Sequence, residues 1–157
     1  RKYDTARFYE SVTLLRRYFD RPAITTDLIC GFPGETEAEF DATLSFIEKC
    51  GFAAMHIFPY SIRPGTKAAA MEQVPSAVKE QRAGRAAQAA ETMRQTYLQG
   101  CVGRVYPVLF EQEKDGYYTG HAPNYCEVGV RANDLHNKVL DVKITGVSGE
   151  MLIGELT

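Results

Sequence analysis

The chain has 157 residues, 45% of them hydrophobic, which is the composition of a globular protein with room for one medium domain or two small ones. Its formal net charge of −2 argues against a uniformly basic nucleic-acid coat, and no apolar run approaches the roughly 20 residues that a membrane-spanning helix needs. The opening RKYDTARFYE lacks the apolar core of a signal peptide, so we expect a cytoplasmic protein without a membrane partner. Because the chain begins with Arg1 rather than Met, we also expect it to be a piece of a longer polypeptide.

Charge is distributed unevenly along the chain. Residues 1–21 carry a net charge of +3 and residues 60–104 carry +4, whereas residues 22–59 carry −5 and residues 105–157 carry −4. A slightly acidic chain is therefore still compatible with a local basic strip.

The first half of the chain is predicted to alternate helices with parallel strands. A helix is expected over residues 5–19, with Asp4 as its N-cap. Its apolar stripe consists of Phe8, Val12, Leu15 and Phe19. Apolar and β-branched runs at residues 24–30 and 53–58 are typical of parallel strands covered on both faces. Two such strands make an incomplete sheet, so we expect neighbours upstream or on another chain, and self-association through the truncated sheet edge.

A glycine-rich turn joins the first strand to a second helix. Thr36 and Glu39 have the spacing of a capping box at the start of that helix. Gly31 and Gly34 supply positive φ angles or let a ligand approach the main chain. The helix is expected to end at Gly51, and its inward residues are Phe40, Leu44 and Ile47.

This turn has two interpretations, an ordinary βα loop or a ligand-binding turn. Backbone NH groups at a helix N-terminus favour an anion. Glu35, Glu37 and Glu39 would repel an anion at that position. The glutamates therefore argue against an unrelated barrel enzyme that binds a sugar phosphate here.

A loop and a long basic helix follow the second strand. Residues 61–71, SIRPGTKAAAM, lie immediately beyond the strand's C-terminal end, where α/β proteins place their ligands. The long helix is predicted from Ser76 to Gln99 and closes at Gly100. Four basic residues on this helix form a face that is either solvated or in contact with RNA: Lys79, Arg82, Arg85 and Arg94.

The remaining sequence is a succession of short strands. Five strands in under sixty residues predict a small closed antiparallel barrel that forms a separate module. Tyrosines at 117, 118 and 125 either stack on bases or fill this barrel. The expected strands are residues 104–110, 117–121, 127–130, 138–145 and 152–156.

The four cysteines, at positions 30, 50, 101 and 126, form no CxxC or CxxxCxxC cluster, and the three histidines are equally scattered. We expect the cysteines to serve apolar packing, with neither a metal site nor a catalytic residue in this chain.

Four segments together resemble the radical-SAM tRNA methylthiotransferases: RKYDT at 1–5, ITTDLICGFPGETEAEF at 24–40, HIFPYSIRPGTKAAAM at 56–71 and YTGHAPNYCEVGV at 118–130. The branch they resemble most acts on threonylcarbamoyladenosine next to the anticodon. The resemblance covers the whole chain in order. It implies an α/β segment of a (β/α) radical-SAM barrel over residues 1–100, followed by an OB-like TRAM barrel that binds RNA over residues 101–157. The rest of the same polypeptide would then be a partner of this chain.

Family members use S-adenosylmethionine and [4Fe-4S] clusters, and closely spaced cysteines hold the clusters. None of the cysteines here matches those positions, so we expect this fragment to be inactive by itself. By resemblance, the cofactor's adenosine would be flanked by the ends of both strands, at Ile29, Gly31, Phe32, Phe58, Tyr60 and Ser61.

The same resemblance implies the anticodon stem-loop of a tRNA as the RNA partner. Contacts are expected from the basic helix and the barrel, at Arg82, Arg85, Arg104, Tyr118, Tyr125, Arg131 and Lys143. Because the barrel is acidic overall, binding by this chain should be weak and strongly dependent on salt. The alternative interpretation is a stand-alone RNA-binding module without catalysis.

Overall fold

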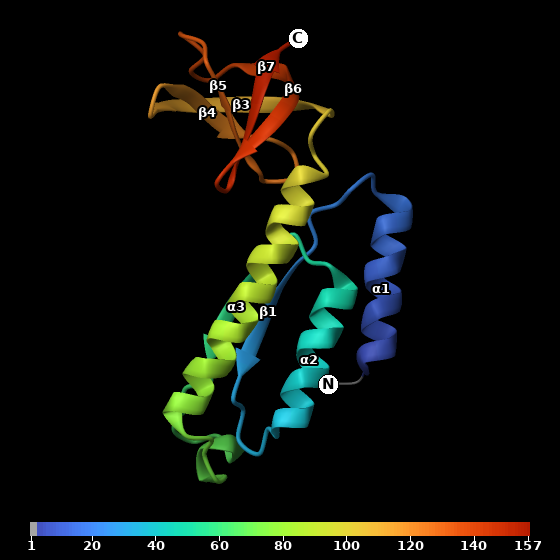
Figure 1. Ribbon diagram of the computed structural model, residues 1–157, viewed down its shortest axis with the longest axis vertical. Helices are drawn as coiled ribbons and strands as arrows, with labels where there is room; N and C mark the ends of the chain where they lie inside the picture. Colours follow the sequence, from blue (N-terminus) through green and yellow to red (C-terminus); the bar gives the residue numbers. More distant parts are fainter. Residues whose placement is uncertain (1–2) are drawn as a thin grey trace. The chain divides into compact units, whose positions relative to one another are not determined.

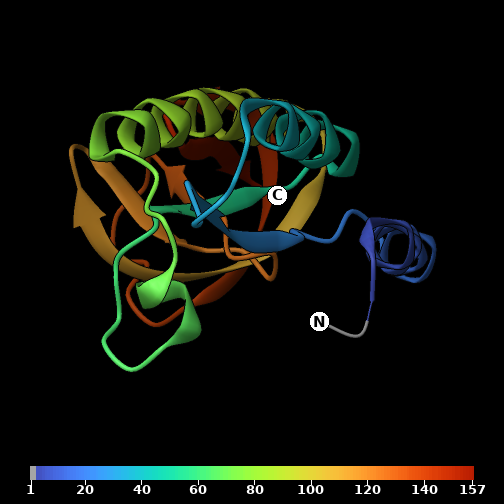
Figure 2. The ribbon, with the colours of Figure 1, turned by 90° about the horizontal axis from the view of Figure 1, so that it is seen from below.

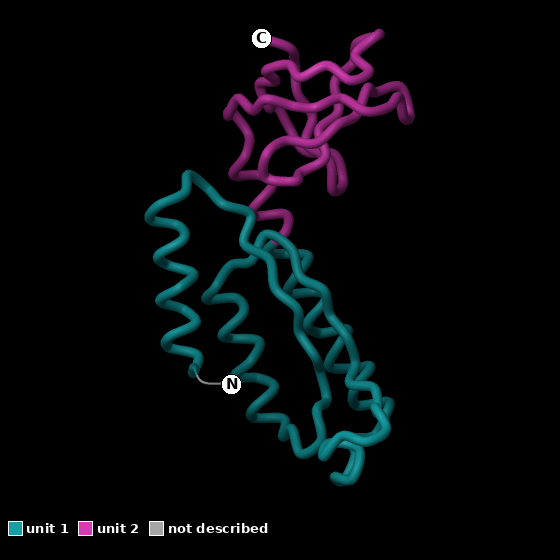
Figure 3. Tube along the Cα trace, turned by 180° about the vertical axis from the view of Figure 1, so that it is seen from behind, with its two compact units in different colours: residues 1–93 teal, residues 94–157 magenta. Residues whose placement is uncertain are grey.

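A computed structural model describes residues 3–157; Arg1 and Lys2, which open the RKYDT motif, lie outside the described residues. The chain divides into two compact units, residues 1–93 and 94–157, and the division falls within the long helix (Figure 3). The elements in chain order are α1 (Thr5–Tyr18), β1 (Thr25–Cys30), α2 (Glu37–Cys50), β2 (Ala54–Pro59), the short 3₁₀ helix η1 (Lys67–Ala70), α3 (Ser76–Gln99), β3 (Val105–Lys114), β4 (Tyr117–His121), β5 (Glu127–Val130), β6 (Val139–Ser148) and β7 (Met151–Leu156) (Figure 1).

The first unit is built on a two-stranded parallel sheet. Strands β1 and β2 pair along their whole length, from Thr25 opposite Ala54 to Cys30 opposite Pro59. Helices α2 and α3 lie on the same side of these strands (Figure 2). Buried Cys30, Phe40 and Ala86 join β1, α2 and α3 in one apolar cluster.

The other face of the sheet is open among the described residues. Burial alternates along β1, and the residues on the open face of the two strands are exposed: Thr25, Asp27, Ile29, His56 and Phe58. The expectation that both strands are covered on both faces is therefore wrong for residues 3–157. Helices of this unit cover one face only, and a parallel sheet normally has both covered.

Local signals placed the helix ends well. The side chain of Asp4 accepts a hydrogen bond from the Arg7 amide at the start of α1. Thr36 and Glu39 form the complete capping box of α2, which ends at Gly51 with a left-handed φ of 62°. These contacts confirm the predicted caps.

The apolar stripe of α1 is buried over its first half only. Val12 is 3% exposed and packs with Ile47 of α2, but Leu15 and Phe19 are 42% and 60% exposed. At this end of α1 the contact with α2 is polar instead, because Arg16 donates hydrogen bonds to the Cys50 and Gly51 carbonyls at 2.5 and 2.7 Å. These are carbonyls that the end of a helix leaves without partners.

The second unit is a closed five-stranded barrel in the order β3-β4-β5-β7-β6. The predicted strand count and closure are confirmed, but the expectation of an entirely antiparallel barrel is wrong, since β5 and β7 run parallel. The cause is parity, because strand directions cannot alternate all the way around a closed ring of five. The barrel core consists of Val108, Phe110, Val128, Val142, Ile144 and Leu152, each at most 1% exposed. No helix within residues 3–157 is long and apolar enough to cross a membrane.

Candidate functional site

The open face of the parallel sheet carries an apolar pair at the C-terminal ends of its strands. Ile29 and Phe58 are register partners on β1 and β2, and they are 53% and 52% exposed. Neither side chain serves the core of this unit. Two of the six expected cofactor-contact residues thus form one exposed apolar surface at the place where parallel sheets bind ligands.

Two aromatic rings extend this surface beyond the strand ends. Phe32 and Tyr60 meet edge to face, with ring centroids 5.2 Å apart. The Tyr60 amide donates to the Cys30 carbonyl at 2.8 Å, and the Tyr60 carbonyl accepts from Nζ of Lys79 at 3.3 Å. That ammonium also lies 5.1 Å from the centre of the Tyr60 ring, which is favourable cation–π geometry. Hydrogen bonds at both its amide and its carbonyl therefore fix the backbone of Tyr60.

Gly31 occupies a position that no other residue fits. Its φ is +71°, and a Cβ there would lie 2.5 Å from Cγ of Lys79. The Gly31 amide donates to Oε2 of Glu35 at 2.8 Å. The carboxylate of Glu35 thus takes the place at the turn that an anionic ligand would need, which agrees with the argument from the glutamates. Ser61, the sixth expected residue, follows Tyr60 and is exposed.

A network of ion pairs fixes this turn to α3. The Arg82 guanidinium is 2.8 Å from the Glu35 carboxylate and 3.2 Å from that of Glu37, and it also donates to the Glu35 carbonyl at 2.9 Å. Arg85 pairs with Glu37 and, at 2.5 Å, with Asp41. Sequence reasoning assigned both arginines to RNA. In the structure they neutralise the acidic turn and the first turns of α2.

Burial decides between the two arginines. The Arg82 side chain is only 6% exposed, so it supports the turn and cannot reach a phosphate, and we remove it from the proposed RNA contacts. The Arg85 side chain is 37% exposed and keeps part of its surface for solvent. The opposite charges of residues 22–59 and 60–104 were the signal in the sequence for this pairing.

The cysteines do not fit an iron–sulfur cluster. All four are buried and free, as expected for apolar packing, and no group of three or more His, Cys, Asp or Glu residues within 3–157 is arranged to hold a metal. Burial, with a contribution from Glu35, raises the pKa of the Cys30 thiol to about 11. In the second unit, a hydrogen bond with Cys101 and burial raise the pKa of the Cys126 thiol. Cysteines bind a cluster as thiolates, so buried neutral thiols are poor cluster ligands.

The tyrosines expected to stack on RNA bases differ in their surroundings. Tyr118 packs its ring edge to face against buried Phe110, with centroids 6.2 Å apart, so it belongs to the barrel wall. Tyr125 is 89% exposed and has a positive φ of 58°, which is unusual for a bulky residue. The neighbouring Asn124 side chain holds this turn by accepting from the Cys126 amide and donating to the Tyr97 hydroxyl. The turn therefore presents an aromatic ring to solvent.

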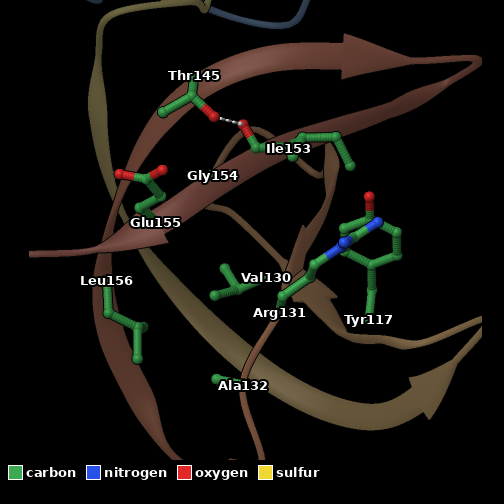
Figure 4. Close-up of a pocket in the computed structure, with 9 residues that line it drawn as sticks. All are labelled: Tyr117, Val130, Arg131, Ala132, Thr145, Ile153, Gly154, Glu155 and Leu156. Atoms are coloured by element: carbon green, nitrogen blue, oxygen red, sulfur yellow. Dashed lines mark hydrogen bonds between the residues drawn. The ribbon is translucent and has the colours of Figure 1, made fainter.

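The three basic residues expected to bind RNA from the barrel also differ. Arg131 and Lys143 are exposed, whereas Arg104 is half-buried and its backbone pairs with Ile144. Arg131 lines a pocket of about 350 Å³ together with Tyr117 and Glu155, two residues that the site prediction did not include (Figure 4). Sequence spacing gave no sign of this pocket, because its residues come from separate strands.

No family model matches this chain, but several curated proteins are similar to it along most of its length. A tRNA-2-methylthio-N(6)-dimethylallyladenosine synthase of Orientia tsutsugamushi (strain Boryong) is 35% identical over 162 residues, covering 99% of this chain and 36% of that protein. The threonylcarbamoyladenosine tRNA methylthiotransferase MtaB of Bacillus subtilis is 35% identical over 151 residues, covering 92% of this chain and 34% of the Bacillus protein. MtaB of Chlamydia pneumoniae is 36% identical over 159 residues, covering 99% of this chain and 38% of the Chlamydia protein. Along almost its whole length, this chain is therefore similar to part of the tRNA methylthiotransferases.

The tRNA methylthiotransferase relatives are much longer than this chain. It spans about a third of the length of the curated relatives that it matches. Relatives named for two different modified adenosines match it equally well, so the degree of identity does not select one of these nucleosides.

Proposed function

We propose that this chain is the C-terminal part of a radical-SAM tRNA methylthiotransferase. Residues 1–100 would contribute to its (β/α) barrel, and residues 101–157 would form a TRAM-type domain that binds RNA. The observation that carries the proposal is the similarity to such enzymes along 99% of the chain. The parallel β1–β2 sheet supports it, because one face is covered by helices and the other is free to line a barrel interior.

The exposed apolar surface at the strand ends is the part of the chain that fits S-adenosylmethionine. Ile29 and Phe58 would contact the adenosine, with the aromatic pair of Phe32 and Tyr60 at its border. Gly31 lets the turn pack against Lys79, and its amide, already bound to Glu35, is not a donor to the cofactor. The bound cofactor would supply a radical when a cluster reduces it. No cluster fits the cysteines of this chain, so we propose that the fragment is inactive by itself.

The substrate we propose is threonylcarbamoyladenosine adjacent to the anticodon of a tRNA. A chimera tests both the family role and the substrate. This chain replaces the matching third of Bacillus subtilis MtaB in cells that lack the native gene, and mass spectrometry of digested tRNA measures methylthiolated nucleosides. A parallel chimera uses the Orientia dimethylallyladenosine enzyme. We expect the methylthiolated threonylcarbamoyl nucleoside from the first chimera.

Variants of the chimera test the cofactor surface. Phe58→Asp puts a charge on the open face and should abolish methylthiolation. Leu14→Asp makes the same kind of change on α1, where Leu14 is 53% exposed, and should leave activity in place. Activity from the Orientia chimera alone would reject the threonylcarbamoyl substrate. If both chimeras fold and carry clusters but are inactive, the enzymatic role itself is refuted.

The RNA partner we propose is the anticodon stem-loop, bound weakly by the barrel. Tyr125 offers a stacking surface, and Arg131 and Lys143 offer exposed cations. Fluorescence anisotropy with a labelled stem-loop should detect binding at low salt that disappears as salt is raised. Binding that is independent of salt, or no binding at low salt, would contradict the proposal.

A further inference from the structure

The pocket beside Arg131 lies where the barrel's parallel strand pair opens. Strand β5 ends at Val130, opposite Gly154, whereas β7 continues to Leu156. Because the two strands are parallel, no hairpin closes this end, and the chain leaves β5 through Arg131 and Ala132. The result is a pocket of about 350 Å³, which is within the size range of small-molecule sites.

The pocket combines a flat cationic surface with an acidic group. The Arg131 guanidinium lies 5.1 Å from the centre of the Tyr117 ring, and Figure 4 shows it laid over that ring on one side of the pocket. Glu155 and Thr145 lie on the other side (Figure 4). The Thr145 hydroxyl donates to the Ile153 carbonyl at 3.3 Å. Leu156 adds an apolar wall.

Neither charged group of the pocket has an oppositely charged partner within the part of the chain that the structure describes. No ion pair or side-chain hydrogen bond joins Arg131 or Glu155 to another residue among 3–157. Lys143 is the register partner of Glu155 on β6, so an exposed cation lies beside the pocket. The outer surface here therefore offers a stacking plane, an acceptor and a neighbouring site for phosphate.

We propose that this pocket binds one unpaired guanine of an RNA strand. The base stacks on the plane formed by Arg131 and Tyr117, as single-stranded bases stack on arginine and aromatic planes. The ionised carboxylate of Glu155 accepts hydrogen bonds but cannot donate. Guanine presents two parallel donors on one edge, N1–H and the 2-amino group, whereas each of the other bases presents fewer on that edge.

The occupant follows from the charges. A free phosphate or other small anion would be repelled by Glu155, and an RNA strand places its phosphates outside the pocket, near Lys143. This inference rests on the proposed RNA-binding function and adds a base preference to it.

Anisotropy with the complete chain and labelled heptanucleotides at low salt tests the inference. The probes are oligouridine with a central guanosine, the same strand with inosine, which lacks the 2-amino group, and oligouridine alone. A bidentate contact predicts roughly 5-fold or greater preference for guanosine over inosine. Glu155→Gln should remove this preference without weakening oligouridine binding. Glu150→Gln makes the same charge change at an exposed turn outside the pocket and should keep the preference.

The outcomes separate the inference from the function on which it rests. Equal binding of the guanosine and inosine strands by the unmodified chain, or a preference that survives Glu155→Gln, overturns the guanine pocket while RNA binding stands. The absence of binding to all three strands at low salt overturns both. Arg131→Gln should weaken all three strands, and an unchanged guanosine affinity in that variant also refutes the pocket.

Discussion

The buried Arg82 should control the stability of the first unit. Its guanidinium bridges the turn after β1 to α3 through Glu35 and Glu37. Arg82→Met preserves much of the side-chain volume but leaves the Glu35 carboxylate, 15% exposed, without its counter-charge. Breaking a buried pair in this way costs about 3–5 kcal/mol, and we expect about 3 because the 58% exposed Glu37 can be solvated by water.

Urea unfolding monitored by far-UV circular dichroism measures this loss. With a slope of about 2 kcal/mol per molar urea, a loss of about 3 kcal/mol lowers the unfolding midpoint by about 1.5 M. Arg85→Met is the matched control. The same substitution three residues further along α3 removes ion pairs whose carboxylates are more than half exposed. Its midpoint should fall by clearly less.

A double variant identifies the mechanism. Glu35→Gln keeps an oxygen that accepts from the Gly31 amide but removes the stranded charge. Arg82→Met combined with Glu35→Gln should therefore be more stable than Arg82→Met alone. If Arg82→Met costs no more than Arg85→Met, or the double variant is no more stable than the single one, the network does not stabilise the turn as argued.

Four further predictions follow from the same structure. Gly31→Ala should destabilise the chain in urea more than Gly34→Ala, because both have positive φ but only Gly31 lies against Lys79; equal losses would contradict the packing argument. Stability should fall as the pH rises from about 9 to about 11, because the unfolded Cys30 thiol ionises first, and Cys30→Ala should flatten this part of the urea-midpoint profile. Reconstitution with iron and sulfide should give no stoichiometric [4Fe-4S] absorbance, and its appearance would reject the cysteine assignment. Light scattering should give a mass above that of the monomer if the edges of β1 and β2 pair between copies, and a monomer at the highest soluble concentration would exclude this.

Structural elements that depend on neighbouring residues could be predicted from the sequence. The capping box at Thr36 and the helix from Ser76 to Gln99 were placed correctly because each depends on residues within one or two turns. The five barrel strands were found for the same reason, with strand ends shifted by up to four residues. Turn residues such as Gly116 and Gly149, both with positive φ, punctuate that region.

Features that depend on distant residues were not readable. Arg82 lies 45 positions from Glu37, so its charge suggested RNA until the fold brought the two together. The exposure of Ile29 depends on which layers are present, and strand composition alone suggested burial. The parallel β5–β7 pair follows from an odd number of strands in a closed ring, which local periodicity does not encode.

The hydrogen bond from the Gly31 amide to Glu35 has a consequence for the entropy of ligand binding. Glu35 is itself held by Arg82, so the turn after β1 is ordered by the chain's own side chains. Ordering a loop during binding would cost about 1–2 kcal/mol for each residue fixed. A ligand that meets this turn finds its backbone already fixed, and none of its affinity is lost to ordering those residues.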